Sequence, residues 1–403
     1  MRIFSSSALL LLLSYIGAVS AAAPIIAQYW PAYSSQTSSQ VPYNQLSIAY
    51  YFVTVTTSTG FELGGGQSVS EMQSFVAKSK AAGKKPVFSL GGWTGSRYFS
   101  ALVNTSAKRT KLARDISAFM TKYGFVGVDI DWEYPNSAGI GCNNPTGWDA
   151  ANYLAFLKVL RSTIGTSNLI TAAVSVNGII GINGSPLASF ADFAKYFDYI
   201  NLMTYDIAGP WSDKTGPTSP LRTCSSDTSV TQAVELWTSR GFPASKILLG
   251  IPSYGISFTT KSSTLATTNV AGYSSRIYQS WTGVTPKGAP GDSNAAGTDV
   301  CGNKGNGGYS GQWTYKQLIS EGLLSSTGTR GLNGYVRYFD ECTQVPFLWK
   351  SSTRHMIVYD DATSAAAKAS FAKSKGLAGV MIFDTTGFDS RVYSAIKSRL
   401  GIA

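Results

Sequence analysis

The stretch from residue 127 to residue 135 reads Gly127-Val128-Asp129-Ile130-Asp131-Trp132-Glu133-Tyr134-Pro135. Its apolar and acidic residues alternate, which is the pattern of a β-strand with two different faces. Alternate side chains of a strand share one face, so we expect Asp129, Asp131 and Glu133 to lie together. The apolar residues between them should face the other side.

Seven further apolar runs, separated by helical patterns, place this strand within a repeated unit. The eight predicted strands are Ile25–Trp30, Leu46–Val53, Pro86–Leu90, Phe125–Trp132, Leu169–Val176, Tyr199–Tyr205, Ile247–Tyr254 and Gly379–Phe383. The predicted helices between them include Glu71–Ala82, Thr110–Tyr123, Ala150–Ile164, Val230–Arg240 and Ser364–Lys375. Eight strands that alternate with helices favour an α/β fold of the closed (β/α)8 type, a TIM barrel.

The acids of the fourth strand would then face the barrel interior near its C-terminal rim, where barrel enzymes carry out chemistry. Ionising all three carboxylates on one buried face would have a large free-energy cost, so at least one proton should stay bound near neutral pH. We expect Glu133, nearest the rim, to be a general acid, with Asp131 beside it and Asp129 deeper. For a single acid, pairing with Lys or Arg at the rim would be the favoured interpretation; three alternating acids favour catalysis.

About 120 residues separate the seventh predicted strand from the eighth, which is too long for an unstructured loop in a compact domain. This interval holds a Gly/Asn/Ser-rich stretch, 288–311, and the strand-like piece 334–339. We therefore predict a barrel over residues 22–255 and 355–403, with a small α+β insertion domain over 256–354 beside the barrel mouth.

The first residues predict secretion. One positive charge, an apolar run over residues 8–13 and small residues up to Ala21 are typical of a signal peptide spanning residues 1–21. No later stretch is long and apolar enough for a membrane span, so we expect a secreted, extracellular protein without a membrane partner.

The four cysteines, Cys142, Cys224, Cys301 and Cys342, suit two disulfides in that compartment, and three pairings are possible. Their spacing matches no zinc site, and the chain has one histidine, so we expect no metal, no cofactor and no Ser-His-Asp chemistry. The net charge of +11 comes from scattered Lys and Arg and indicates a solvated basic surface rather than a nucleic-acid site. Weak adhesion to an acidic cell wall is the alternative. We expect a monomer.

Several motifs resemble glycoside hydrolase family 18, most of all secreted fungal chitinases with an α+β insertion. The resemblance covers essentially everything after the signal peptide. The motifs are Asp129–Pro135, Ser89-Leu90-Gly91-Gly92-Trp93, Asn201-Leu202-Met203-Thr204-Tyr205-Asp206, Gly250–Gly255, Tyr359-Asp360-Asp361 and Gly379-Val380-Met381.

The resemblance implies hydrolysis of β-1,4 bonds between N-acetylglucosamine units of chitin or chitooligosaccharides, with retention of configuration. The family lacks a protein nucleophile, and the acetamido oxygen of the substrate attacks instead. Glu133 would be the acid and then the base, and Asp131 would orient the acetamido group. Asp129 would share a proton with Asp131. Tyr205 and Asp206 would hold the acetamido group.

The remaining candidate residues would bind substrate or support the acids. The resemblance implies that Tyr29 and Ser89 donate hydrogen bonds to Asp129. Sugar faces stack on aromatic rings, which makes aromatic residues at strand ends candidate platforms. The predicted substrate-binding set is Trp93, Tyr134, Met203, Trp211, Phe383, Tyr29 and Ser89.

Two positions depart from the family pattern. Val126 stands where an acid is common, and Phe383 stands where a tryptophan usually forms the floor under the distorted sugar. Phenylalanine keeps a ring but has no N–H donor, so rate and substrate placement are affected more than the chemistry.

Two other functions are compatible with this fold. A chitin-binding lectin would have lost Glu133, which this chain retains. An endo-β-N-acetylglucosaminidase acting on N-glycans would share the acids, but usually without the insertion or Tyr359-Asp360-Asp361.

Overall fold

The computed structural model describes residues 23–225, 228–270 and 272–402, and the predicted signal peptide lies outside them. Eight parallel strands form a closed barrel in the order β1-β18-β8-β7-β6-β5-β4-β2, and β1 pairs with β2 to complete the ring. They are β1 (Ile25–Pro31), β2 (Ile48–Thr56), β4 (Lys85–Gly91), β5 (Gly127–Asp131), β6 (Leu169–Val174), β7 (Tyr199–Leu202), β8 (Ile247–Pro252) and β18 (Gly379–Phe383). The predicted TIM barrel is confirmed, and a short strand, β3 (Phe61–Leu63), adds to the end of β2.

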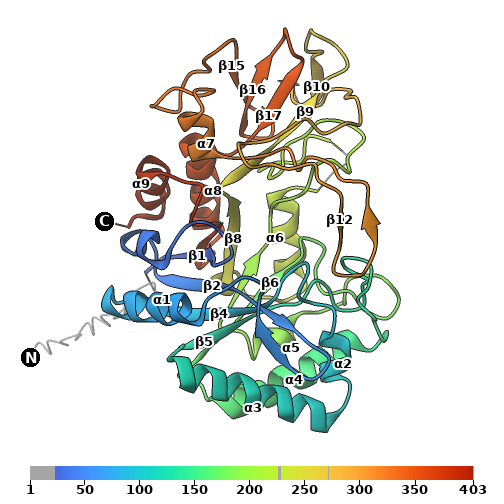
Figure 1. Ribbon diagram of the computed structural model, residues 1–403, viewed down its shortest axis with the longest axis vertical. Coiled ribbons are helices and arrows are strands. Elements are labelled where there is room, and N and C mark those ends of the chain that lie inside the picture. The colour runs from blue at the N-terminus through green and yellow to red at the C-terminus, as the bar shows by residue number, and fades with distance from the viewer. Residues whose placement is uncertain (1–22, 226–227, 271, 403) are drawn as a thin grey trace, which may run out of the picture.

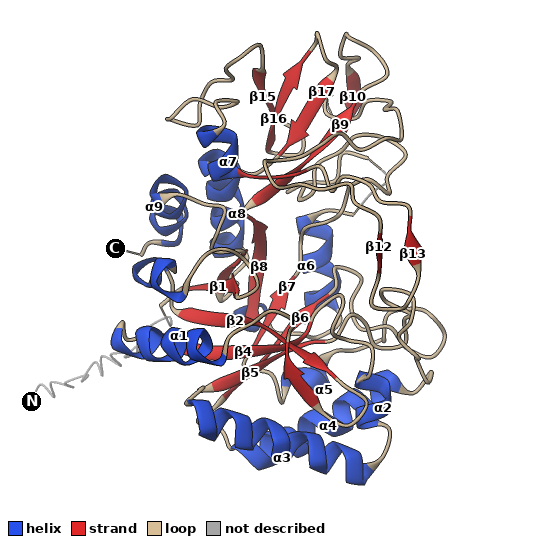
Figure 2. Cartoon of the chain, viewed as in Figure 1, coloured by secondary structure: helices blue, strands red, loops and turns tan. Residues whose placement is uncertain are grey.

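Helices follow most strands and lie outside the barrel (Figure 2). They are α1 (Val69–Ala81), α2 (Phe99–Val103), α3 (Ser106–Tyr123), α4 (Asp149–Ile164), α5 (Ala191–Ala194), α6 (Val230–Ser239), α8 (Ala362–Ser374) and α9 (Ser390–Leu400). Side-chain caps fix where several begin: the Ser68 side chain accepts a hydrogen bond from the Glu71 backbone, and Thr105 accepts one from Lys108. Gly124 caps the C-terminus of α3, and its φ of 80° suits glycine.

The two faces of β5 separate the core from the candidate site. Val128, Ile130 and Trp132 belong to the large apolar cluster between the strands and the helices. A smaller cluster fills the barrel interior with residues such as Tyr29, Tyr50 and Met381.

The chain between β8 and β18 forms a second sheet, which lies at the top of Figure 1. Its antiparallel order is β14-β9-β17-β16-β15, formed by β9 (Tyr254–Thr259), β14 (Gln312–Thr314), β15 (Val336–Asp340), β16 (Val345–Lys350) and β17 (His355–Val358). A helix, α7 (Tyr315–Ser320), follows β14, and a small hairpin pairs β10 (Thr268–Val270) with β11 (Tyr273–Ser275). This sheet takes in residues just outside the predicted limits of 256 and 354.

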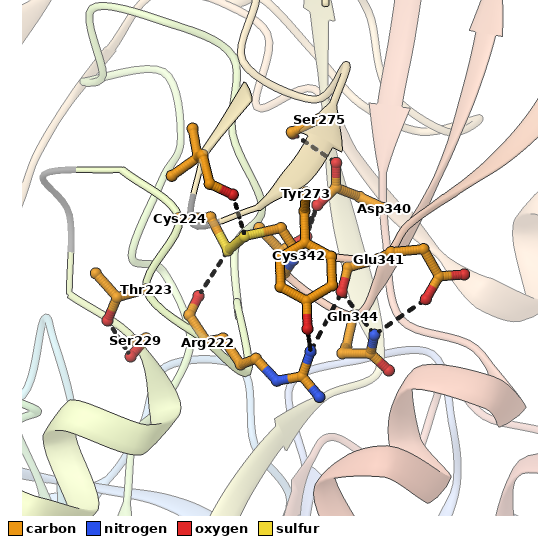
Figure 3. The surroundings of a disulfide bond; sticks show 12 residues. Arg222, Thr223, Cys224, Ser229, Tyr273, Ser275, Asp340, Glu341, Cys342 and Gln344 are labelled. Carbon is orange, nitrogen blue, oxygen red and sulfur yellow. Dashed lines mark hydrogen bonds between the residues drawn. A yellow bond between two sulfur atoms is a disulfide. The ribbon is translucent and has the colours of Figure 1, made fainter. Parts of the chain in front are cut away.

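Two disulfides connect distant segments and decide among the three possible pairings. Cys224–Cys342 ties the loop before α6 to the turn between β15 and β16. Around it, Arg222 donates hydrogen bonds to the Tyr273 hydroxyl and to the Glu341 carbonyl (Figure 3). Cys142–Cys301 ties the loop after β5 to the 288–311 stretch.

Among the described residues, no helix combines the length and apolar character needed to cross a bilayer.

Candidate active site

The three predicted acids lie in a row at the C-terminal end of β5. Asp129 is fully buried and Asp131 is 3% exposed, whereas Glu133, just beyond the strand, is partly exposed. The acids thus run from the closed interior to the open rim. Gly91 makes the close packing here possible, because a Cβ on it would lie 2.1 Å from the Asp131 carbonyl oxygen.

Asp129 accepts four hydrogen bonds. Tyr29 and Ser89 donate to Oδ2 at 2.7 and 3.0 Å, as expected from the family resemblance. Thr171 and Asn201 donate to Oδ1 at 2.7 and 3.0 Å. Burial raises the pKa of Asp129, and the four donors oppose that rise by stabilising the carboxylate.

Asp131 has the opposite surroundings. Its Oδ1 is buried without a hydrogen-bond partner. Burial, followed by the charges of Glu133 and Asp129, raises its pKa well above the ordinary value. No hydrogen bond joins Asp131 to Asp129 in the described part of the chain, since both oxygens of Asp129 are occupied by other donors.

Glu133 has a pKa suited to an acid at neutral pH. Burial raises the pKa to about 7, the charge of Asp206 adds to the rise, and a hydrogen bond with Tyr134 opposes it. The backbone around Glu133 is fixed on both sides: its N–H donates to Ser96 Oγ at 2.9 Å, and its carbonyl accepts from Asn143 Nδ2 at 2.7 Å.

Tyr205 and Asp206 follow β7 and lie close to these acids. The Tyr254 hydroxyl donates to Asp206 Oδ1 at 2.6 Å. Asp206 is exposed at the edge of this group of acids. Desolvation by the surrounding protein nevertheless raises its pKa, and the hydrogen bond from Tyr254 opposes that rise. Burial, and then the charges of Asp131, Asp206 and Glu133, raise the pKa of Tyr205 well above its ordinary value, so its hydroxyl remains a donor.

Aromatic rings form the floor beside the acids. Phe383 lies with its ring centroid 5.9 Å from Tyr205, 5.7 Å from Tyr29 and 5.4 Å from Phe52. Tyr50 stacks on Tyr29 at 4.6 Å. Phe383 therefore presents an aromatic surface next to Tyr205, at the position where the family usually has tryptophan.

The other predicted binding residues follow β4, β5 and β7. Trp93, after β4, is 50% exposed, and Trp211, in the loop after β7, is 64% exposed. Tyr134 and Met203 are partly exposed. The two tryptophans have the open ring faces that a sugar platform needs.

Sequence reasoning missed three side chains that donate hydrogen bonds to carboxyl groups of the site, those of Thr171, Asn201 and Tyr254. Thr171 pairs in register with Asp129 across β5 and β6, and polar residues on the inward face of β6 were the available signal. Asn201 and Tyr254 stand inside motifs that were recognised, but no role was assigned to either.

Val126, the other departure, lies at the opposite end of the barrel. It precedes β5 and lines a cavity of about 250 Å³ with residues such as Lys80 and Asn168. The missing acid is therefore remote from the three acids on β5. Within the described residues, no group of three or more His, Cys, Asp or Glu side chains could hold a metal ion.

Comparisons with known proteins agree with this geometry. Residues 25–387 match the family model described as glycosyl hydrolases family 18. A chitinase-like effector from Moniliophthora roreri is 35% identical over 94% of both chains, and one from Moniliophthora perniciosa is 33% identical over 90% of this chain and 82% of its own length. The crystal structure of a chitinase from Rhizomucor miehei superposes with a TM-score of 0.83, at 27% identity, over 93% of this chain and 99% of that one. With the match spanning the barrel and its row of acids, this chain belongs to glycosyl hydrolase family 18.

Proposed function

We propose that this protein is a retaining chitinase that hydrolyses β-1,4 bonds between N-acetylglucosamine units with the help of the substrate's own acetamido group. The observation that carries the proposal is the graded row of acids along and just beyond β5: Asp129 accepts four hydrogen bonds, Asp131 Oδ1 has no donor among the described residues, and Glu133 has a pKa of about 7. Secretion fits the proposal, because both disulfides require an oxidising compartment.

Glu133 is the proposed general acid. A group with a pKa near neutrality holds its proton in a large share of molecules at neutral pH, and it can release that proton to the glycosidic oxygen. The resulting carboxylate then takes a proton from water in the second step.

Asp131 is the proposed partner of the acetamido group. Its buried Oδ1 lacks a donor, and an acetamido N–H would supply one. The hydrogen bond would orient the carbonyl oxygen for attack on the anomeric carbon. Once its proton has passed to Asp129, as the family resemblance implies, the Asp131 carboxylate would stabilise the positive charge of the oxazolinium ion. Asp129, fixed by four donors, lies one step deeper on the same face and is the proposed partner of Asp131 in sharing that proton.

Tyr205 and Asp206 are proposed to hold the acetamido carbonyl, and Phe383 to lie under the sugar. Trp93 and Trp211 would extend the binding site along the saccharide chain. Substrates without a 2-acetamido group at the cleaved position, such as cellulose, should be inert.

The test is hydrolysis of N-acetylglucosamine hexamer by the wild type and by Glu133→Gln. We expect the variant to bind the hexamer and to lose hydrolysis, while the wild type releases products with the β configuration. Wild-type-like turnover by Glu133→Gln would refute the role of Glu133.

Binding without hydrolysis is the second candidate function, because two of the relatives are named chitinase-like effectors. The complete row of acids favours catalysis. A wild type that binds the hexamer without cutting it, over several hours at pH 5 to 7, would favour the binding function instead.

A further inference from the structure

The stretch from residue 288 to residue 311, here called the strap, is a self-supporting ribbon. At its base, the Asp292 carboxylate accepts backbone hydrogen bonds from Gly288 at 2.7 Å and from Ser310 and Gly311 at 3.0 Å. These bonds hold the two ends of the strap together. The strap therefore leaves the second sheet as a closed ribbon and not as two independent strands.

The middle and the tip of the strap are ordered in the same way. β12 (Gly297–Thr298) pairs in antiparallel register with β13 (Lys304–Gly305). At the tip, the Asp299 side chain accepts backbone hydrogen bonds from Cys301 and Asn303, both at 2.8 Å. Local hydrogen bonds thus fix a ribbon that has almost no apolar core.

The tip of the strap is attached to the barrel at two points. Cys301 forms the disulfide with Cys142 in the loop after β5, and the Val300 carbonyl accepts a hydrogen bond from Arg97 in the loop after β4. Figures 1 and 2 show β12 and β13 running from the second sheet down to these loops. The strap is therefore a bridge with both ends fixed.

Both loops that receive the strap carry residues of the candidate site. Trp93 lies four positions before Arg97. Asn143, next to Cys142, donates to the Glu133 carbonyl at 2.7 Å. The strap thus ends on the side of the site that holds one exposed tryptophan and the proposed acid.

The opposite side of the site is formed by the loop after β7, which contacts a segment of the insertion next to the second sheet. Trp211 lies in the loop after β7, and Trp281 Nε1 donates to the carbonyl of the neighbouring Ser212 at 2.8 Å. The Thr215 backbone donates to the Gln279 carbonyl at 2.9 Å, which fixes the same loop to the 275–281 segment. The strap therefore links the side that carries Trp211 to the side that carries Trp93.

We propose that the strap and the Cys142–Cys301 disulfide close a ring of protein across the barrel mouth, and that a polymeric chitin chain is retained within this ring between successive cuts. This inference rests on the proposed chitinase function and goes beyond it to the manner of action. A chain inside a closed ring leaves only by sliding along its own length, whereas an open groove also permits sideways release. A short oligomer slides out quickly in either case, so the ring slows the dissociation of long substrates selectively.

The experiment compares two variants that each lose one disulfide. Cys142→Ser/Cys301→Ser frees the tip of the strap, and Cys224→Ser/Cys342→Ser is the matched control. The two disulfides span 159 and 118 residues, so their loss has similar consequences for the unfolded chain. Arg97→Ala removes the second attachment and leaves the Cys142–Cys301 disulfide in place. For each protein, kcat/KM is measured on soluble N-acetylglucosamine pentamer, and the dimer-to-trimer ratio of early products, which reports successive cuts, is measured on insoluble chitin.

We expect Cys142→Ser/Cys301→Ser to lower the dimer-to-trimer ratio on chitin by about threefold or more, while kcat/KM on the pentamer stays within about twofold of the wild type. Arg97→Ala should change the ratio in the same direction, and the control variant should leave it unchanged. An unchanged ratio in both strap variants overturns the proposal, as does an equal loss on pentamer and polymer, which would assign the disulfide to the positioning of Glu133. A wild type that cuts neither substrate removes the chitinase function itself, and the strap proposal with it.

Discussion

Replacing Glu133 with glutamine should stabilise the fold above about pH 7 while it removes the proposed acid. The pKa of Glu133 is about 7, against an ordinary value of 4.5. Between these values the folded protein holds a proton that the unfolded chain has already released. The free energy of unfolding therefore falls as the pH rises from about 4.5 to about 7. Above that range, the whole loss of stability caused by the Glu133 charge is present.

The size of the effect follows from the same two values. The difference between the pKa of Glu133 and its ordinary value corresponds to about 3 kcal/mol in the free energy of unfolding, at 1.36 kcal/mol for each pKa unit. At about 2.1 cal/mol/K per residue, a chain of this length has an unfolding entropy of about 0.8 kcal/mol/K, so the expected rise in Tm is about 4 °C. Glutamine has nearly the same shape but no charge, so Asp131 also loses a repulsive neighbour.

Differential scanning calorimetry of both proteins at pH 4 and pH 8 measures this effect. Glu133→Gln should melt higher than the wild type at pH 8 and close to it at pH 4. Glu235→Gln, at an exposed position on α6, is the control and should change neither melting temperature. An equal gain at both pH values, or no gain at pH 8, would show that the charge of Glu133 is not costly in the folded protein.

Three further predictions concern charges and hydrogen bonds around the site. Asp206→Asn removes a charge that raises the pKa of Glu133, so the fall in kcat at high pH should move to lower pH in a pH–rate profile. Thr171→Val removes one donor from the innermost acid and should cost about 2 kcal/mol in urea unfolding, whereas Thr171→Ser should recover most of it. Lys368→Met leaves the fully buried Asp360 without its partner at 2.5 Å and should lower the free energy of unfolding by about 3–5 kcal/mol. A double variant that also carries Asp360→Leu should be more stable than Lys368→Met alone, because no buried charge is then left unpaired.

The barrel could be predicted from sequence because each strand is a short apolar run between helical patterns. The ends of the observed strands differ from the predicted ends by at most three residues. At the seventh strand, the predicted stretch 247–254 covers both β8, which ends at Pro252, and the start of β9 in the second sheet. The chain changes sheets at Ser253, whose backbone donates to the Phe383 carbonyl and whose side chain accepts from the Asp384 backbone. No local pattern in the sequence marks such a long-range contact.

The row of acids was also readable from sequence, since alternation alone places three carboxylates on one face of β5. The different environments of the three acids could not be predicted from the sequence. Thr171 on β6 and Asn201 on β7 contact Asp129 only because the closed barrel brings β5, β6 and β7 into register. The same limit applies to the strap, whose Gly/Asn/Ser-rich composition resembles an irregular loop, while Asp292 and Cys301 give it a fixed path.

Three carboxylates of similar chemistry gain different properties because one strand carries them from the closed interior to the open rim. Asp129 is fully buried, which raises its pKa, and it accepts hydrogen bonds from four donors that oppose this rise. Burial, followed by the charges of Glu133 and Asp129, raises the pKa of Asp131, and no donor among the described residues reaches its Oδ1, so it favours a ligand that brings one. Burial, followed by the charge of Asp206, raises the pKa of Glu133 to about 7, and Glu133 is the partly exposed member of the row. The environments of the acids, and not their residue types, thus assign the roles in the proposed mechanism.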